Sequence, residues 1–285
     1  MDSFPLGGLS VARVGFGAMQ LPGPNAFGPP RDRDEALAVL RRAVELGVNH
    51  IDTAQFYGPD VANELIREAL HPYPDDLALV SKVGGRRDDA GAWLPAGEPA
   101  ELRRDIETNL RSLDVDRLAV VNLRVFESDG PDQLFDDQLS GLIGARDAGL
   151  IGGIGLSNVN REHLLHALGR TEIACVQNAF NIVDRDSAPV LEECTRQGIA
   201  FVPFFPLGAA FMGPNPVLSH QLVVDAAERL GRTPAQVALA WTLGVAPNVL
   251  LIPGTSSVAH LEENMAVASI ELDADTRERL NGAAA

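Results

Sequence analysis

The sequence predicts an α/β protein folded as a single (β/α)8 barrel of the TIM type, preceded by a β-hairpin. Short runs rich in β-branched and other apolar residues alternate with amphipathic stretches of helical period along the whole chain. Eight such alternations can be counted in 285 residues, and barrels of this kind typically take about 250. No linker or low-complexity segment interrupts the pattern, so residues 1–285 are expected to form one barrel domain.

The eight expected strands are short, and a helix is expected after each of them. The strands are 14–17, 49–52, 78–82, 118–124, 152–156, 173–177, 200–204 and 249–252. The helices are 34–46, 62–69, 100–113, 132–147, 161–168, 187–196, 220–244 (broken near 233–234) and 258–268. Gly47, Gly149 and Gly198 each end a helix just before a strand, where glycine takes the left-handed C-cap conformation at least cost. The stretch 4–13 predicts the hairpin.

The composition excludes several classes of function. With 39 acidic and 23 basic residues the formal charge is −16, which repels nucleic-acid phosphates and anionic lipids, so neither is an expected partner. The start of the chain has no signal-peptide pattern, and no run of about 18 apolar residues occurs, so a cytoplasmic protein is expected. Cys175 and Cys194 have no zinc-ligand or C-x-x-C spacing, so no disulfide framework or metal site is expected.

Three polar residues near the carboxyl ends of the second and third expected strands are candidates for chemistry, because barrel sites lie at these ends. Asp52 ends the second strand, Tyr57 follows it in the loop, and Lys82 ends the third. Lys82 is the only lysine among 23 basic residues. A lysine ammonium is a compact charge whose pKa shifts on burial, whereas arginine is a permanently charged planar fork. The lone lysine therefore indicates a role that arginine does not fill.

These three side chains suit proton donation to a carbonyl oxygen. Tyrosine has a pKa near 10 and is a poor donor at neutral pH, but an adjacent ammonium favours the phenolate and is expected to lower that pKa. Asp52 would hold the ammonium and balance its charge. Tyr57 is thus expected to act as a general acid, and such a donor needs a reductant beside it.

Taken in order along the chain, a set of short motifs resembles the aldo-keto reductase superfamily. The matching segments are G-F-G-A-M at 15–19, G-V-N-H-I-D-T-A-Q-F-Y-G at 47–58, S-K at 81–82, G-I-G-L-S-N at 153–158, V-Q-N at 176–178, F-P-L-G at 205–208, T-P-A-Q-V-A-L-A-W at 233–241 and I-P-G-T-S-S-V-A-H-L-E-E-N at 252–264. One motif alone would be weak, but the ordered set is specific and covers nearly the whole chain.

The resemblance implies NAD(P)H-dependent reduction of a small carbonyl compound, with Asp52, Tyr57 and Lys82 matching three of the family's four catalytic residues. It also implies a set of positions around the nicotinamide and pyrophosphate. These are Gly17, Ala18, Met19, Asp52, Ser157, Asn158, Gln177, Phe204, Phe205, Pro206, Leu207 and Gly208. By this resemblance Ser157, Asn158 and Gln177 hold the nicotinamide carboxamide, and an aromatic ring at or beside Phe204 stacks on the nicotinamide.

The adenosine-phosphate end of the cofactor is implied at the last strand and the helix after it, since helix N-termini suit phosphate. The positions that match the family are Pro253, Gly254, Thr255, Ser256, Ser257, His260, Glu263 and Asn264. The family often supplies lysine or arginine for the 2′-phosphate, whereas this segment offers hydroxyls and His260. NADPH is the expected cofactor, with NADH left open.

The fourth catalytic position of the family, a histidine at the end of the fourth strand, departs from the pattern. The strand here reads L-A-V-V-N-L-R-V from 118 to 125 and contains no histidine. Alignment puts Arg124 at the histidine position, with Asn122 on the same face by strand alternation. An arginine does not release its proton near neutrality, so it would hold an anion or polarise an oxygen. Either residue could face a substrate that carries an oxyanion near its aldehyde.

The same strand and the F-V-P-F-F-P-L-G segment look like the branch of the superfamily that contains bacterial pyridoxal reductases. Pyridoxal, which this reaction converts to pyridoxine, has a phenolic oxygen beside its aldehyde. Two other functions stay open: an NADPH-binding regulatory or interaction subunit with slow turnover, and a ketoreductase of a natural-product pathway. Trp93, in the loop after the third strand, would line a pocket or pin that loop. The sequence leaves the oligomeric state undetermined.

Overall fold

A ring of parallel strands lies at the centre of the structure. The protein is described here from a computed structural model, which covers residues 2–126, 129–208 and 215–284. Seven strands form one parallel sheet in the order β11–β10–β9–β8–β5–β4–β3. They are β3 (Phe16–Gly17), β4 (His50–Asp52), β5 (Ala78–Val83), β8 (Leu118–Arg124), β9 (Ile151–Ser157), β10 (Cys175–Gln177) and β11 (Ala200–Phe201).

The segment 249–251 closes this sheet into a barrel. Val249 forms a parallel bridge to Phe201 at one edge, and Leu251 forms one to Val14 at the other. The expected eighth strand thus exists as isolated bridges. Close backbone contact at this seam requires glycine, because a Cβ atom on Gly17 would lie 2.5 Å from the carbonyl oxygen of Ile252.

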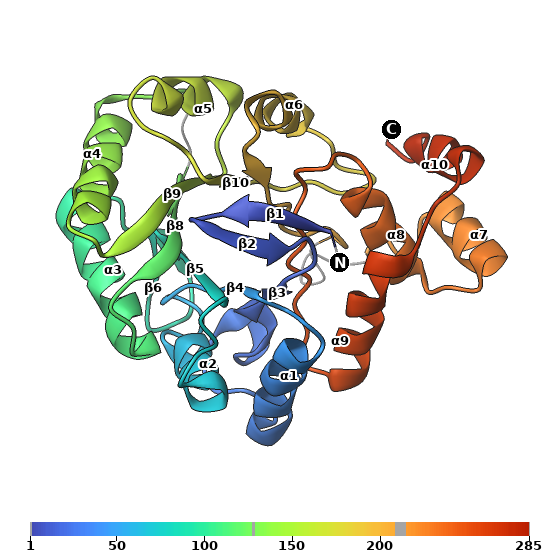
Figure 1. Ribbon diagram of the computed structural model, residues 1–285, viewed down its shortest axis with the longest axis horizontal. Helices are drawn as coiled ribbons and strands as arrows, with labels where there is room; N and C mark the ends of the chain where they lie inside the picture. Colours follow the sequence, from blue (N-terminus) through green and yellow to red (C-terminus); the bar gives the residue numbers. More distant parts are fainter. Residues whose placement is uncertain (1, 127–128, 209–214, 285) are drawn as a thin grey trace.

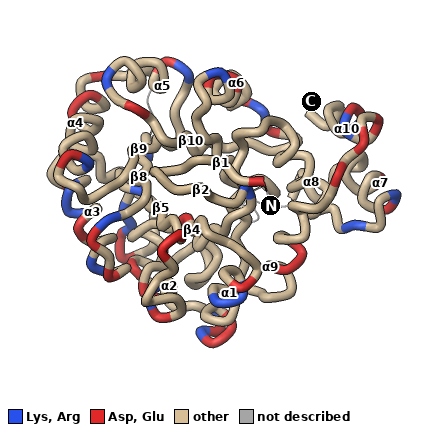
Figure 2. The backbone as a smooth tube through the Cα atoms, in the orientation of Figure 1, with Lys and Arg blue, Asp and Glu red and all other residues tan. Residues whose placement is uncertain are grey.

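The helices surround the barrel (Figure 1). They are α1 (Arg33–Glu45), α2 (Val61–Leu70), α3 (Pro99–Leu113), α4 (Gln133–Asp147), α5 (Arg161–Leu168), α6 (Ala188–Gln197), α7 (Gln221–Leu230), α8 (Pro234–Leu243), α9 (Val258–Met265) and α10 (Ala274–Asn281), with 3-10 turns η1 (Ala18–Gln20), η2 (Pro24–Ala26) and η4 (Ala266–Ser269). Most charged residues belong to these outer helices and the loops, and few belong to the central strands (Figure 2). Within the described ranges, no helix combines the length and apolar composition needed to cross a membrane.

The predicted N-terminal hairpin is confirmed as β1 (Ser3–Leu6) paired with β2 (Leu9–Ala12). It lies across one end of the ring of strands (Figure 1). Leu6 and Val11 pack with Ala78, Val120 and other residues near the strand starts in a buried apolar cluster. The hairpin therefore covers the amino-terminal end of the barrel and leaves the carboxyl ends of the strands for a site.

The structure corrects several element boundaries. The expected strand 200–204 ends at Phe201, and Phe204 makes only a single bridge to Ala179. The break expected near 233–234 in the helix 220–244 is confirmed: Gly231 takes a left-handed conformation (φ 61°) at the end of α7, and Thr233 caps α8. Helix α10 and the antiparallel hairpin of β6 (Gly85–Arg87) and β7 (Trp93–Pro95) were not predicted.

Candidate active site

The strand register brings the predicted polar residues to the carboxyl end of the barrel. Asp52 on β4 lies opposite Gly17 on β3, and Arg124 on β8 lies opposite Ser157 on β9. Ser157 in turn lies opposite Gln177 on β10. Because side chains alternate along a strand, these residues all face the barrel interior.

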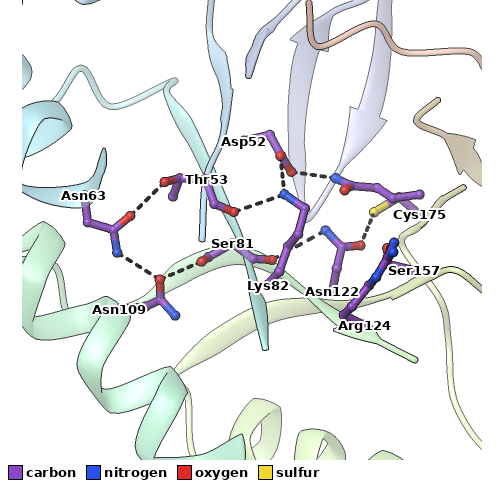
Figure 3. Close-up of polar contacts among 11 residues, drawn as sticks. Asp52, Thr53, Asn63, Ser81, Lys82, Asn109, Asn122, Arg124, Ser157 and Cys175 are labelled. Atoms are coloured by element: carbon purple, nitrogen blue, oxygen red, sulfur yellow. Dashed lines mark hydrogen bonds and ion pairs between the residues drawn. The ribbon is translucent and has the colours of Figure 1, made fainter. Parts of the chain in front are cut away.

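Asp52 and Lys82 form a buried ion pair at this end of the barrel (Figure 3). The Lys82 ammonium also donates to the carbonyl oxygen of Thr53 at 3.1 Å. The other carboxylate oxygen of Asp52 accepts a 2.5 Å hydrogen bond from the amide of Gln177. Burial opposes the charge on Lys82, but attraction to Asp52 and Tyr57 outweighs it and leaves the pKa of Lys82 above its ordinary value. Lys82 is therefore a fixed cation at neutral pH.

Tyr57 lies beside this cation, with the Lys82 Nζ atom 5.2 Å from the centre of its ring. Burial raises the pKa of Tyr57, while Lys82 and Arg124 lower it and Asp52 raises it further; the net shift is upward. The expectation that the ammonium brings the pKa of Tyr57 below its ordinary value is therefore wrong. The direction of the Lys82 effect is as expected, but desolvation of a phenol with 6% exposure is the larger influence.

A cavity of about 270 Å³ opens above Tyr57 and Lys82. The residues that line it are Met19, Phe56, Tyr57, Lys82, Trp93, Arg124, Phe126, Ser157, Phe204 and Phe205. The cavity is mostly aromatic, with one phenol and two cations in its wall. Phe56 and Phe126 were not predicted as site residues, since apolar loop residues give no chemical signal in a sequence.

The structure distinguishes the two candidates on β8. The Arg124 guanidinium lines the cavity, donates to the Ser157 hydroxyl at 3.3 Å and lies 5.0 Å from the centre of the Phe204 ring. Asn122 is fully buried one layer below, where it accepts from the Cys175 thiol at 3.2 Å and contacts the Ser81 carbonyl (Figure 3). Asn122 does not line the cavity, so the expectation that it could face the substrate is not supported.

Arg124 carries a charge with no carboxylate partner among the described residues. Burial lowers the pKa of Arg124 from its ordinary value, but a guanidinium stays protonated at neutral pH. A half-buried cation at the wall of an aromatic cavity is a site for an anionic oxygen of a ligand.

The residues expected around the nicotinamide fit a carboxamide group, which needs one donor and one acceptor. Gln177 donates its amide to Asp52, and its Oε1 atom is a buried acceptor with no hydrogen-bond partner in the described part of the chain. Asn158 is exposed next to it, in a left-handed conformation (φ 60°) that its side-chain bond to the Val125 carbonyl stabilises. An orphaned acceptor beside an exposed amide is the pattern that a bound carboxamide would satisfy.

The other expected nicotinamide and pyrophosphate positions differ in whether they line the cavity. Met19, Phe204 and Phe205 line the cavity, whereas Ala18 is fully buried and does not line it. Gly17 packs against the backbone of the last strand segment. Pro206, Leu207 and Gly208 form the turn after Phe205, and the Leu207 carbonyl accepts from the Asn215 amide at 2.5 Å.

The expected adenosine-phosphate positions surround the start of α9. Ser256, His260 and Glu263 are exposed, Ser257 is half-buried at the N-cap, and Pro253, Thr255 and Asn264 are buried. A Cβ atom on Gly254 would lie 2.4 Å from the Gly17 carbonyl oxygen. One neighbour was not predicted: the Glu35 carboxylate on α1 accepts from the Val258 backbone N–H at 3.0 Å. The sequence held no signal for this contact, because the two residues are 223 positions apart.

A buried network of hydrogen-bonded amides and hydroxyls links α2 and α3 to the carboxyl ends of β4 and β5 (Figure 3). Asn109 on α3 accepts from the Ser81 hydroxyl at 2.6 Å and from Asn63 at 3.0 Å, and it donates to the Gln55 side chain at 2.9 Å. Asn63 on α2 accepts from the Thr53 hydroxyl at 2.8 Å. The network therefore fixes the residues that neighbour Asp52, Lys82 and the loop of Tyr57. None of its members was predicted.

Comparison with known proteins agrees with this geometry. A sequence profile described as Aldo/keto reductase family matches residues 13–285. The chain is 51% identical to pyridoxine 4-dehydrogenase of Escherichia coli over 284 residues, covering 99% of this chain and 98% of that protein. It is 38% identical to an uncharacterized oxidoreductase of Schizosaccharomyces pombe, covering 97% of this chain and 88% of the other. The crystal structure of an aldo/keto reductase from Klebsiella pneumoniae in complex with NADP and acetate superposes with a TM-score of 0.80 at 25% identity, covering 99% of this chain and 94% of that one. The chain therefore belongs to the aldo/keto reductase family of oxidoreductases.

Proposed function

We propose that the protein reduces pyridoxal to pyridoxine with NADPH, with Tyr57 as the proton donor and Arg124 as the residue that holds the phenolic oxygen of the substrate. The observation that carries the substrate assignment is the Arg124 guanidinium, which shares an aromatic cavity with Tyr57 and has no carboxylate partner among the described residues. The 51% identity to a pyridoxine 4-dehydrogenase supports the same substrate.

In this proposal Tyr57 gives its phenolic proton to the carbonyl oxygen of the aldehyde. Bound NADPH supplies the hydride that the carbonyl carbon receives. Lys82 stabilises the phenolate that remains, because its ammonium lies next to the ring and its charge is fixed by Asp52. Gln177 orients Asp52 through the 2.5 Å hydrogen bond, so the acid, the cation and its counter-ion act as one unit.

Residues of three regions would hold the cofactor. Gln177, Asn158 and Ser157 offer the donors and acceptors for the carboxamide, and Phe204, which lines the same cavity as Ser157, offers an aromatic face. The segment 253–264 offers backbone N–H groups and hydroxyls to the adenosine phosphate.

We also propose that residues 1–285 form one barrel domain. The family match over residues 13–285 and the packing of the N-terminal hairpin on the barrel support this.

The test is a steady-state assay of NADPH oxidation by the purified protein with three aldehydes. Pyridoxal, pyridine-4-carbaldehyde and glyceraldehyde differ in the features that Arg124 and the aromatic wall would recognise. We expect the highest kcat/KM for pyridoxal, and a parallel series with NADH gives the nucleotide preference. Equal turnover of the three aldehydes, or none of pyridoxal, refutes the substrate. Cofactor binding without repeated turnover of any aldehyde would instead favour a regulatory subunit.

Replacing Arg124 with methionine is expected to raise the KM for pyridoxal by about 10- to 100-fold, the effect of losing one charge-assisted hydrogen bond. Pyridine-4-carbaldehyde lacks the phenolic oxygen and serves as the matched substrate whose KM should change little. An equal rise in KM for both aldehydes would mean that Arg124 shapes the cavity and does not bind the oxygen.

The two reaction directions should differ in their pH dependence. Reduction needs the protonated phenol, and burial raises the pKa of Tyr57 above its ordinary value of 10.0. The kcat for reduction should therefore stay flat from about pH 6 to about pH 9. Oxidation of pyridoxine needs the phenolate, so its kcat should rise by about tenfold per pH unit over the same range. A downward inflection of the reduction rate below about pH 9 would contradict the raised pKa.

A further inference from the structure

Arg87, on the β6–β7 hairpin, lies between two aromatic rings above the cavity. Its guanidinium carbon is 3.9 Å from the centre of the Trp93 ring and 5.3 Å from that of Phe27. At these distances a guanidinium attracts the faces of both rings, and its planar shape allows stacking that a lysine would not reproduce. The two rings belong to separate segments, since Trp93 is on β7 and Phe27 follows η2.

The same guanidinium binds backbone carbonyls of both segments. Within the hairpin, Arg87 donates to the Gly91 carbonyl at 3.0 and 2.6 Å. Across the gap it donates to the carbonyls of Asn25 at 2.9 Å and Ala26 at 3.4 Å. Asn25 and Ala26 both have left-handed backbones (φ 58° and 54°), which cost conformational energy in residues other than glycine. The contacts with Arg87 help to hold these two residues in that conformation.

The segment that Arg87 binds also contacts the loop of the proton donor. The backbone N–H of Gly58, the residue after Tyr57, donates to the Ala26 carbonyl at 3.0 Å. The Gly28 N–H donates back to the Gly58 carbonyl at 3.1 Å, and Phe27 and Gly58 form a parallel bridge. Arg87 thus joins the β6–β7 hairpin to the backbone that carries Tyr57.

Among the residues that Arg87 contacts, Trp93 is one that lines the cavity. Its ring lies 5.5 Å from Phe56 and 6.4 Å from Tyr57, edge to face in both cases, and 40% of the residue is exposed. It lines the same cavity as Arg124. An exposed indole next to the proton donor is a surface on which a planar ring can pack.

We propose that Arg87 is a positioning residue that holds Trp93 in place as the aromatic wall of the substrate site, and that it thereby selects planar aromatic carbonyl compounds over small aliphatic ones. Arg87 does not line the cavity and acts through Trp93. The inference rests on the proposed carbonyl-reductase function, but it concerns a contact that can be measured without turnover.

The first test measures the environment of Trp93 in cofactor-free protein. The chain has two tryptophans, so a Trp241→Phe background leaves Trp93 as the sole emitter. We expect Arg87→Lys to shift the Trp93 emission to the red and to increase its quenching by acrylamide. Arg86→Lys is the matched control, because Arg86 is the exposed neighbour on the same strand and should leave both signals unchanged. Unchanged emission in Arg87→Lys overturns the proposal.

The second test separates specificity from general damage. Arg87→Lys should raise the KM for pyridoxal and benzaldehyde by roughly 3- to 10-fold, the value of one aromatic contact, and leave that for glyceraldehyde unchanged. Trp93→Leu should produce the same pattern, and the double variant should match Trp93→Leu alone. An equal rise for all three aldehydes, or additive effects in the double variant, overturns the role of Arg87. Failure of wild-type protein to reduce pyridoxal would refute only the substrate proposal, since the emission and benzaldehyde comparisons would still apply.

Discussion

Replacing Tyr57 with phenylalanine is expected to lower the kcat of aldehyde reduction by about 10²- to 10⁴-fold and to leave the Kd for NADPH unchanged. The variant keeps the ring and its edge-to-face contacts with Phe56 and Trp93 but removes the proton that the carbonyl oxygen would receive. Lys82 and Arg124 also line the cavity, but both keep their protons at neutral pH and are not expected to replace the donor. Single-turnover kinetics and fluorescence titration with NADPH measure the two quantities.

Tyr73, the only other tyrosine of the chain, provides the matched control. Its hydroxyl donates to the Leu113 carbonyl at 2.6 Å, at the carboxyl end of α3, and it does not line the cavity. Tyr73→Phe should keep full kcat and lose about 1 kcal/mol of unfolding free energy for the missing hydrogen bond. If Tyr57→Phe retained more than about a tenth of the wild-type kcat, Tyr57 would not be the proton donor.

Replacing Lys82 with methionine is expected to damage stability and activity together. Asp52, with 2% exposure, would become a buried carboxylate without a counter-ion, a change that typically costs about 3–5 kcal/mol of unfolding free energy. The kcat should also fall by about 10²-fold or more, because the phenolate of Tyr57 would lose the cation that stabilises it. Urea denaturation and steady-state kinetics measure the two losses.

The double variant Asp52→Asn, Lys82→Met separates the two effects. Removing both charges leaves no uncompensated ion in the barrel, so most of the lost unfolding free energy should return. The kcat should stay low, since Tyr57 would still lack its neighbouring cation. Recovery of kcat together with stability would mean that the ion pair serves only to hold the fold.

Much of the barrel could be predicted from the sequence because its signals are local. The strand 118–124 and the helix 161–168 have the predicted bounds, since an apolar run and helical periodicity define each of them. Asp52 and Lys82 could be paired because the carboxyl ends of neighbouring parallel strands meet at one edge. The β6–β7 hairpin was not predicted, because its strands have three residues each, which is too short to show a strand periodicity.

The features of the site that were not predicted depend on how deeply a side chain is buried and on contacts between residues far apart in the sequence. Alternation along β8 puts Asn122 and Arg124 on one face, but only the packing of Asn122 against Cys175 shows that it lies below the cavity. The direction of the Tyr57 pKa shift depends on how far the folded chain shields the phenol from water. The spacing of residues in the sequence does not contain this information. The contact of Arg87 with Trp93 depends on the fold of a loop.

The apolar hairpin under the barrel also bears on the route by which protons would reach Tyr57. Leu6 and Val11, with the apolar side chains of the strand starts, fill the lower half of the barrel, and His50 above them is held neutral because burial lowers its pKa to about 4. Neither ring nitrogen of His50 has a hydrogen-bond partner among the described residues. We therefore expect the proton that Tyr57 would give away to be replaced through the cavity, which would couple reprotonation of Tyr57 to release of the alcohol.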